Sequence, residues 1–202
     1  EQAGGKQRTI ATIDVSVESF QEEVLLTQFD FRKIFEDWGG VIDFSRMNDF
    51  MRNLGTRLKT GVVRAHLRFP YFLEKAAPIS GATSLMEYNC GYDGQWLSSG
   101  DLDSMFSVQV PVTTLCPCSR DISDHGAHNQ RSLVSLSARF HRGRFLWLED
   151  LVRDIEQVAS AEVFALLKRP DEKYLTERAY SRPRFVEDLV REVAMKMRER
   201  AE

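Results

Sequence analysis

Residues 113–132 bring together side chains that could do chemistry. This segment reads TTLCPCSRDISDHGAHNQRS and contains Cys116, Cys118, His125 and His128. Thiolate and imidazole groups are ligands that zinc and similar divalent metals prefer. A thiolate is also a competent nucleophile when a nearby cation or metal lowers its pKa. The segment therefore predicts a metal site, a reactive sulfur, or both.

The two neighbouring cysteines are poor candidates for a disulfide or a redox pair. A disulfide between Cys116 and Cys118 would close a strained ring that Pro117 stiffens further. The C-x-C spacing also differs from the C-x-x-C of thioredoxin-like redox sites. The chain has three cysteines, an odd number that disfavours a disulfide framework, and we expect Cys90 to be a core sulfur. One alternative stays open, namely that both motif cysteines are packed and unreactive.

The composition is that of an ordinary globular protein. The chain has 202 residues, of which 43% are hydrophobic and 28% charged, with a formal net charge of −3. The negative charge disfavours a general nucleic-acid surface. No apolar run approaches the ~20 residues needed to cross a bilayer. We therefore expect a cytoplasmic protein with no nucleic-acid or membrane partner.

The spacing of apolar residues predicts an α+β fold. Alternating apolar residues predict strands at 10–17, 63–69, 84–92, 106–112 and 133–140, with a turn at 78–81. Helical spacing predicts helices at 29–38, 45–58, 148–159 and 185–197. The order of these elements indicates two similar modules in one chain, at approximately residues 8–100 and 101–202.

Four longer motifs resemble those of type IB GTP cyclohydrolase I: VPVTTLCPCSRDISDHGAHNQRS, RFPYFLEKAAP, LLKRPDEKYLTERAY and PRFVEDLVREVA. The likeness extends over roughly residues 10–197. It implies the tunnelling fold, in which two tandem modules of antiparallel sheet layered with helices close into a barrel by oligomerisation, as a homotetramer. It also implies hydrolysis of GTP by water to formate and 7,8-dihydroneopterin triphosphate, for folate and 7-deazaguanine-type tRNA nucleoside biosynthesis.

The resemblance assigns metal-binding and catalytic roles. Cys116, His128 and Glu172 are expected to bind a divalent metal, which could be zinc, manganese or iron. Such an ion lowers the pKa of bound water. Cys118 would be the free thiol beside C8 of guanine. From the residues themselves, C-P-C at alternate strand positions predicts that both sulfurs point to the same side.

The resemblance also assigns substrate contacts. Glu187 is expected to accept hydrogen bonds from the guanine edge, which a fixed carboxylate suits. The basic residues expected to hold the triphosphate are Arg131, Lys75, Lys168 and Arg169. Each of these charges could instead be a solvated surface group, Glu172 could be a turn carboxylate, and His125 is a weaker candidate on a loop.

Two features of the family have no counterpart in these residues. The family has a basic GTHMSR-like segment after its first strand, and a histidine-bearing segment near its C-terminus. Two other functions stay open. One is a tunnelling-fold nitrile reductase, which uses a covalent cysteine and NADPH. The other is a non-catalytic module in which Cys116, Cys118 and His128 bind a structural metal.

Overall fold

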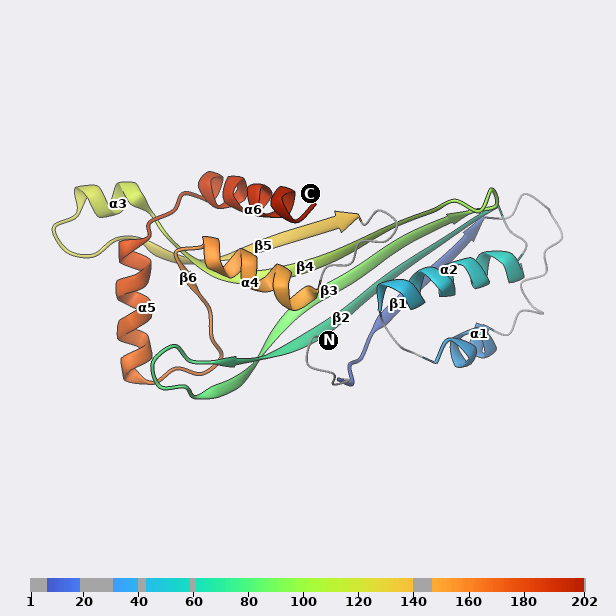
Figure 1. The fold of residues 1–202 in the computed structure, drawn as a ribbon, viewed down its shortest axis with the longest axis horizontal. Helices are drawn as coiled ribbons and strands as arrows, with labels where there is room; N and C mark the ends of the chain where they lie inside the picture. Colours follow the sequence, from blue (N-terminus) through green and yellow to red (C-terminus); the bar gives the residue numbers. More distant parts are fainter. Residues whose placement is uncertain (1–6, 19–30, 40–42, 59–60, 140–146, 202) are drawn as a thin grey trace.

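One antiparallel sheet runs through the molecule (Figure 1). The computed structural model describes residues 7–18, 31–39, 43–58, 61–139 and 147–201. The strands are β1 (Thr12–Glu18), β2 (Val62–Ala76), β3 (Thr83–Leu97), β4 (Leu102–Leu115), β5 (Asn129–Arg139) and β6 (Ala161–Glu162). Their order is β1-β2-β3-β4-β5, and β6 pairs with β4.

Helices accompany the sheet. The described helices are α1 (Phe31–Trp38), α2 (Phe44–Leu58), α3 (Pro117–Ile122), α4 (Leu148–Val158), α5 (Arg169–Ser181) and α6 (Val186–Ala201). In Figure 1, α1 and α2 lie along one half of the sheet, and α4 and α6 lie along the other. Within the described residues, no helix combines the length and apolar character needed to cross a membrane.

Both pairs of helices cover the same face of the sheet. On β3, Met86, Tyr88 and Cys90 belong to a core cluster that includes residues of α4 and α6. Tyr92 and Trp96 belong to a second cluster that includes residues of α1 and α2. All five positions are even-numbered, so their side chains leave the strand on one side. Polar side chains occupy the other face, among them Arg64, His66, Arg68, Asn89 and Asp93.

A glycine sets how closely α2 approaches the sheet. A Cβ atom placed on Gly55 would lie 2.1 Å from a ring carbon of Trp96. Any side chain at this position would therefore force the helix and the ring apart. The missing side chain lets α2 lie directly on the indole, which joins this core cluster together.

Asp171 fastens the start of α5 to the turn between β2 and β3. Its side chain is fully buried. One carboxylate oxygen accepts the backbone N–H groups of Ile79 (2.9 Å) and Ser80 (2.8 Å). The other accepts the Ser80 hydroxyl (2.7 Å) and the backbone N–H of Lys168 (2.9 Å). Burial alone would raise the pKa of the Asp171 carboxyl, but these hydrogen bonds hold it below its ordinary value.

The predicted α+β class is confirmed, and so are most of its elements. The five predicted strands are β1 to β5, although β2, β3 and β4 are much longer than expected. The four predicted helices are α1, α2, α4 and α6. Residues 29, 30 and 140 of the predicted elements lie outside the described residues. The structure adds two helices that were not predicted, since α3 is very short and α5 (RPDEKYLTERAYS) has no clear apolar stripe.

Among the residues that the structure describes, the strands form an open sheet that does not close on itself. The tunnelling fold, the division into two tandem modules and barrel closure by oligomerisation therefore stay predictions. The two core clusters do not follow the expected modules, because the cluster under α4 and α6 also includes Phe69, Met86, Tyr88 and Cys90 of the first half.

Replacing Asp171 by Asn should lower the thermal unfolding midpoint by several degrees, because an amide nitrogen would face N–H groups that now meet a carboxylate. The pKa of the Asp171 carboxyl is lower in the folded than in the unfolded state. The stabilisation that its carboxylate provides is therefore complete above the unfolded-state pKa and is lost as the pH falls through the folded-state pKa. The difference from wild type should thus be largest near neutral pH and shrink below about pH 4. Circular dichroism melts over this range measure it. Glu177→Gln, an exposed carboxylate on the same helix, is the control. An equal effect of both changes would contradict the role of Asp171.

Candidate active site

Cys116 and His128 face each other where the β4–β5 ladder ends. The last assigned pair of this ladder is Leu115 with Asn129. The same register pairs Cys116 with His128, and the backbone N–H of Cys116 donates to the carbonyl oxygen of His128 at 2.9 Å. Directly opposed residues of an antiparallel pair project on one face, with Cβ atoms about 5 Å apart. A thiolate and an imidazole so placed fit as two ligands of one divalent ion.

The prediction that the C-P-C motif lies on a strand is wrong. β4 ends at Leu115, Cys116 is the N-cap of α3, and Cys118 lies in the first turn of that helix. Pro117 favours this helix start because it has a fixed φ and no N–H to leave unpaired. The thiol of Cys118 still reaches the sulfur of Cys116, so the two thiols remain neighbours. Cys118 is the more exposed of the two.

The local backbone makes Cys116 more acidic than an ordinary cysteine. The backbone N–H of Ser119 has the largest part in lowering the pKa of the Cys116 thiol, and Cys118 adds to the effect. Cys90 is the opposite case. Burial raises the pKa of the Cys90 thiol to about 12, and its side chain lies in the core as predicted. The exposure of the two motif cysteines, and the lowered pKa of Cys116, therefore suit reactive or metal-binding groups, whereas Cys90 is a buried core residue.

Glu187 follows shortly after Arg184, a residue that contacts the start of this motif directly. The backbone N–H of Arg184 donates to the carbonyl oxygen of Leu115 at 2.9 Å. The chain thus passes beside the cysteines just before α6 begins, and Glu187 is an exposed residue in the first turn of that helix. His125 is also exposed, on the loop before His128, where its backbone bonds to Ser123.

Glu172 does not join Cys116 and His128 within one subunit. It follows Asp171 at the β2–β3 end of α5 and pairs with Arg169 at 2.9 Å. The other end of α5 is the one near the cysteines, since Arg120 of α3 donates to the carbonyl oxygen of Tyr180 at 3.1 Å. Tyr180 lies eight positions after Glu172 in the helix, a rise of about 12 Å along the axis.

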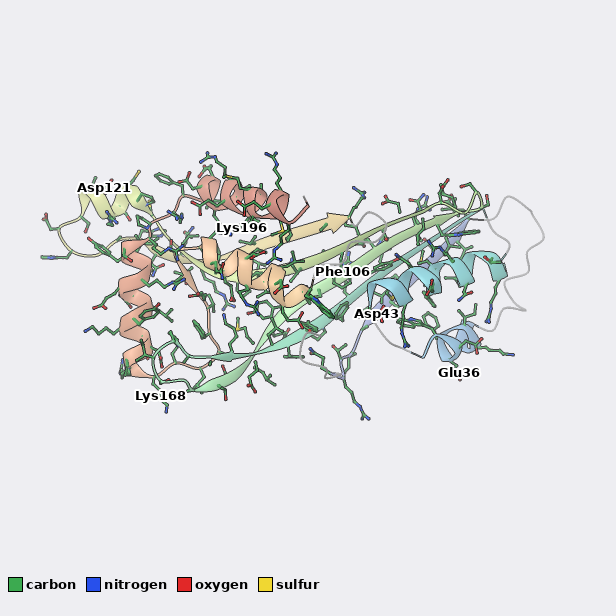
Figure 2. The ribbon with its side chains drawn as sticks, viewed as in Figure 1. Glu36, Asp43, Phe106, Asp121, Lys168 and Lys196 are labelled. Carbon is green, nitrogen blue, oxygen red and sulfur yellow. The ribbon has the colours of Figure 1, made fainter. Side chains whose placement is uncertain are left out.

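The side-chain view shows the same separation (Figure 2), with Lys168 marking the start of α5 and Asp121 marking α3. Among the described residues, no three or more Cys, His, Asp or Glu side chains come together to hold a metal ion. Of the three residues expected to bind the metal, the structure thus places Cys116 and His128 opposite each other and Glu172 apart from them.

The basic residues expected at the triphosphate are spread over the molecule. Arg131 is exposed and lies opposite Thr113 on β4. Lys168 is the exposed N-cap of α5. Lys75 is largely buried, with 13% of its side chain exposed, and its Nζ lies 2.7 Å from a carboxylate oxygen of Glu156. Their contacts with a triphosphate stay predictions.

Lys75 belongs to a buried polar network under α4. Its ammonium also donates to the carbonyl oxygen of Val163 at 2.9 Å and lies 4.2 Å from the centre of the Phe164 ring. The Tyr88 hydroxyl donates to the same Glu156 oxygen at 2.9 Å. Burial raises the pKa of the Glu156 carboxyl, and Lys75 and Tyr88 oppose that rise. The positive charge of Lys75 is thus paired with the buried carboxylate of Glu156.

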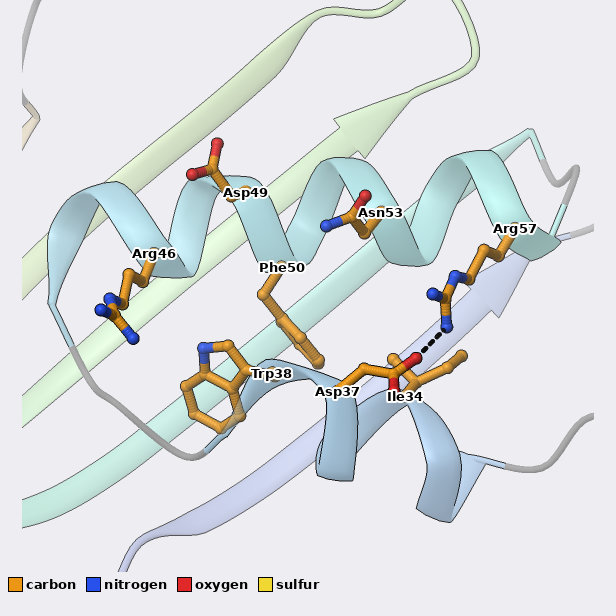
Figure 3. A pocket seen from close by; sticks show the side chains of 8 residues that line it. All are labelled: Ile34, Asp37, Trp38, Arg46, Asp49, Phe50, Asn53 and Arg57. Carbon is orange, nitrogen blue, oxygen red and sulfur yellow. Dashed lines mark hydrogen bonds and ion pairs between the residues drawn. The ribbon is translucent and has the colours of Figure 1, made fainter.

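Two surface hollows lie away from these residues. One, of about 280 Å³, lies between α1 and α2. Figure 3 shows Trp38 and Phe50 beside it and an ion pair of 2.8 Å between Arg57 and Asp37 across it. The other, of about 580 Å³, lies on the polar face of the sheet and is lined in part by Arg68 and Ser107. Neither hollow contains a residue whose type and spacing in the sequence predicted chemistry.

Sequence reasoning did not single out Asp171 or Ser119, whose contacts shape the start of α5 and the cysteine motif. A helix-start signal could have found Asp171, because Pro170 is followed by an acidic residue at the third helical position. Ser119 follows a proline-led helix start in the same way, but its partner His128 is fixed only by the strand register.

Lys75→Met should lower the free energy of unfolding by about 3 kcal/mol at pH 8, because it leaves a buried carboxylate without its cation. Without Lys75 the pKa of Glu156 rises further above its unfolded-state value. The stability of the variant therefore falls as the pH rises from the unfolded-state pKa through the folded-state pKa of Glu156. The loss should consequently be smaller at about pH 5 than at pH 8. Urea unfolding at the two pH values measures it, with the exposed Lys173→Met as control. A loss independent of pH would contradict the network.

The similarity to known proteins covers the whole chain. A family model described as type I GTP cyclohydrolase folE2 matches residues 1–202. The GTP cyclohydrolase FolE2 of Syntrophus aciditrophicus is 42% identical over 199 residues, which are 98% of this chain and 77% of that protein. The corresponding protein of Syntrophobacter fumaroxidans is 38% identical over 198 residues (98% and 76%). That of Nitrosomonas eutropha is 42% identical over 191 residues (95% and 71%).

These matches agree with the resemblance seen in the cysteine motif and name the FolE2 type, rather than the label IB. The match includes the strand end, the short helix and the loop that place Cys116 opposite His128. On this similarity over its full length, the chain belongs to the type I GTP cyclohydrolase FolE2 family.

Proposed function

We propose that this protein hydrolyses GTP at C8 of guanine, releasing formate and 7,8-dihydroneopterin triphosphate. The observation that carries this proposal is the pairing of Cys116 with His128 at the end of the β4–β5 ladder. The family match supplies the substrate, because the similar proteins are named GTP cyclohydrolases. This match favours hydrolysis over the nitrile reductase and over a non-catalytic metal module. The IB subdivision, the cytoplasmic location and the pathway served stay predictions.

The donor set of this site suits a divalent metal. A thiolate and an imidazole on neighbouring chain segments, with a carboxylate as third ligand, fit zinc, manganese or iron. When bound, such an ion supplies a Lewis acid that lets water ionise near neutral pH. Cys116 contributes a thiol whose pKa is already lowered by the N–H of Ser119.

The other residues of the site would hold and orient the substrate. Glu187 projects from the first turn of α6, near the chain's contact with Leu115, and is proposed to accept hydrogen bonds from the N–H groups of the guanine edge. Cys118 is exposed beside Cys116 and is proposed to lie next to C8, where its thiol can exchange a proton with the opening ring. Arg131 and Lys168 are proposed to contact the triphosphate.

Completion of the site is proposed to require a second copy of the chain. Cys116 and His128 lie at one end of α5 and Glu172 lies at the other, so a Glu172 from a second subunit would supply the third ligand. The sheet formed by the described strands is open, with β1 and β5 at its edges. The elements around the cysteine motif also carry exposed apolar side chains, namely Ile122, Tyr180, Phe185, Val186 and Val190. We infer a homo-oligomer, as the tetramer that closes a barrel.

The purified protein should release formate from GTP and form a fluorescent pterin after oxidation, when supplied with zinc, manganese or iron. Cys116→Ala and His128→Ala should each lose bound metal and this activity together, because each removes a ligand.

Cys118→Ser should keep the metal and lose most turnover, since a hydroxyl is a far weaker acid than a thiol. Metal analysis beside the formate assay separates these outcomes. Metal retained by Cys116→Ala but lost from Cys118→Ser would show that the two cysteine roles are reversed.

Mixing two inactive variants tests the shared site. Cys116→Ala and Glu172→Ala should each be inactive alone, but subunits exchanged under mild denaturation should regain part of the activity. A mixed oligomer can combine Cys116 of one subunit with Glu172 of the other. Mixing Cys116→Ala with His128→Ala is the matched control. This mixture should recover no activity. Cys116 and His128 of each site come from the same subunit, so every site would lack one of the two. Absence of recovery in the first mixture, with subunit exchange verified by mass spectrometry, would place all ligands in one subunit.

A further inference from the structure

The first pair beyond the β4–β5 ladder has an unusual hydrogen-bond pattern. A hydrogen-bonded antiparallel pair normally exchanges two N–H···O=C bonds, one in each direction. Cys116 and His128 make only the first of these, from the N–H of Cys116 to the carbonyl oxygen of His128. In place of the second, the Ser119 hydroxyl accepts the N–H of His128 at 2.7 Å and donates to the carbonyl oxygen of Cys116 at 3.0 Å.

The Ser119 hydroxyl therefore stands between two backbone groups that would otherwise meet. It keeps the two segments apart at the position where the strands end and α3 begins. It also ties the N–H of His128 to the helix that carries both cysteines. This connection matters because residues 121–126 before it are all exposed and therefore provide little packing to fix the imidazole.

We propose that Ser119 is a positioning residue that holds Cys116 and His128 at the separation needed to bind one metal ion. This inference rests on the proposed metal site of the cyclohydrolase. Without the hydroxyl, the second rung of the ladder can close directly, or the N–H of His128 can turn to water. Either change alters the separation and direction of the two ligands. Groups that orient metal ligands typically contribute about 10- to 100-fold in metal affinity.

The same loop contains a matched control. The Ser123 hydroxyl donates to the carbonyl oxygen of His125 at 2.9 Å and accepts the N–H of the same residue at 3.3 Å. It is thus a serine of the same segment with the same kind of backbone contacts. Its contacts stay within the loop and do not connect the segment of Cys116 to that of His128.

The test measures cobalt binding rather than activity. Co²⁺ affinity, from competition with a coloured chelator, and the visible spectrum of the cobalt protein are compared for wild type, Ser119→Ala, Ser119→Thr, Ser123→Ala and Cys116→Ser. Ser119→Ala should bind Co²⁺ at least about tenfold more weakly and show shifted ligand-field bands, because the ligand geometry changes. Ser119→Thr, which keeps the hydroxyl, should resemble wild type, and so should Ser123→Ala.

Each result supports or overturns a defined part of this inference. Wild-type affinity and spectrum in Ser119→Ala overturn the role of Ser119 and leave the metal site standing. An equal loss in Ser123→Ala, or no rescue by threonine, also overturns it. A thiolate–cobalt band is expected in the wild-type spectrum and not in that of Cys116→Ser. If wild type also shows no such band, both the metal site and the inference are overturned.

A measurement on the metal-free wild-type protein guards against a Ser119→Ala variant that does not fold. Amide hydrogen exchange followed by NMR should show a protected N–H at His128, because this group is bonded to Ser119, and a faster one at His125. Exchange at His128 as fast as at His125 would overturn the inference without any variant.

Discussion

The register of the β4–β5 ladder is the constraint on which the candidate site depends. Because Leu115 pairs with Asn129, the next residues along each strand, Cys116 and His128, must meet. A shift of the register by one residue would send these side chains to opposite faces. The register is secured along the rest of the ladder, where buried Val110 lies opposite Val134 on the helix-covered face. The packing of the core thus fixes the chemistry at the strand end.

The helix α5 separates two groups of polar residues by its length. At one end the buried Asp171 holds the helix to the β2–β3 turn, with Glu172 and Lys168 beside it. At the other end lies α3 with the cysteines. A rigid helix cannot bring these groups together within one chain. This separation is the physical basis of the proposal that a second copy of the chain completes the site.

The buried network around Glu156 shows how the sheet tolerates charge in its core. Lys75, Tyr88 and Glu156 satisfy one another between β2, β3 and α4. The carboxylate would be costly in this place without the ammonium and the hydroxyl. A lysine that looks available for a phosphate in the sequence is consequently engaged in the protein interior. The sequence is compatible with an exposed or a buried Lys75, and its neighbours in the tertiary structure determine that it is buried.

The α+β class, the strands and the amphipathic helices follow from the pattern of apolar residues, because alternation and helical spacing are local signals that agree with the packing of the fold. The sequence also singled out Cys116, Cys118 and His128 as candidate site residues, since their residue types are rare and lie close along the chain. Tertiary structure decided the rest. It placed the cysteines at a helix start instead of on a strand, moved Glu172 to the far end of α5, and inserted Ser119 between the two proposed ligands. The last two outcomes depend on contacts between separate segments, of Asp171 with the β2–β3 turn and of Ser119 with His128, which local patterns do not encode.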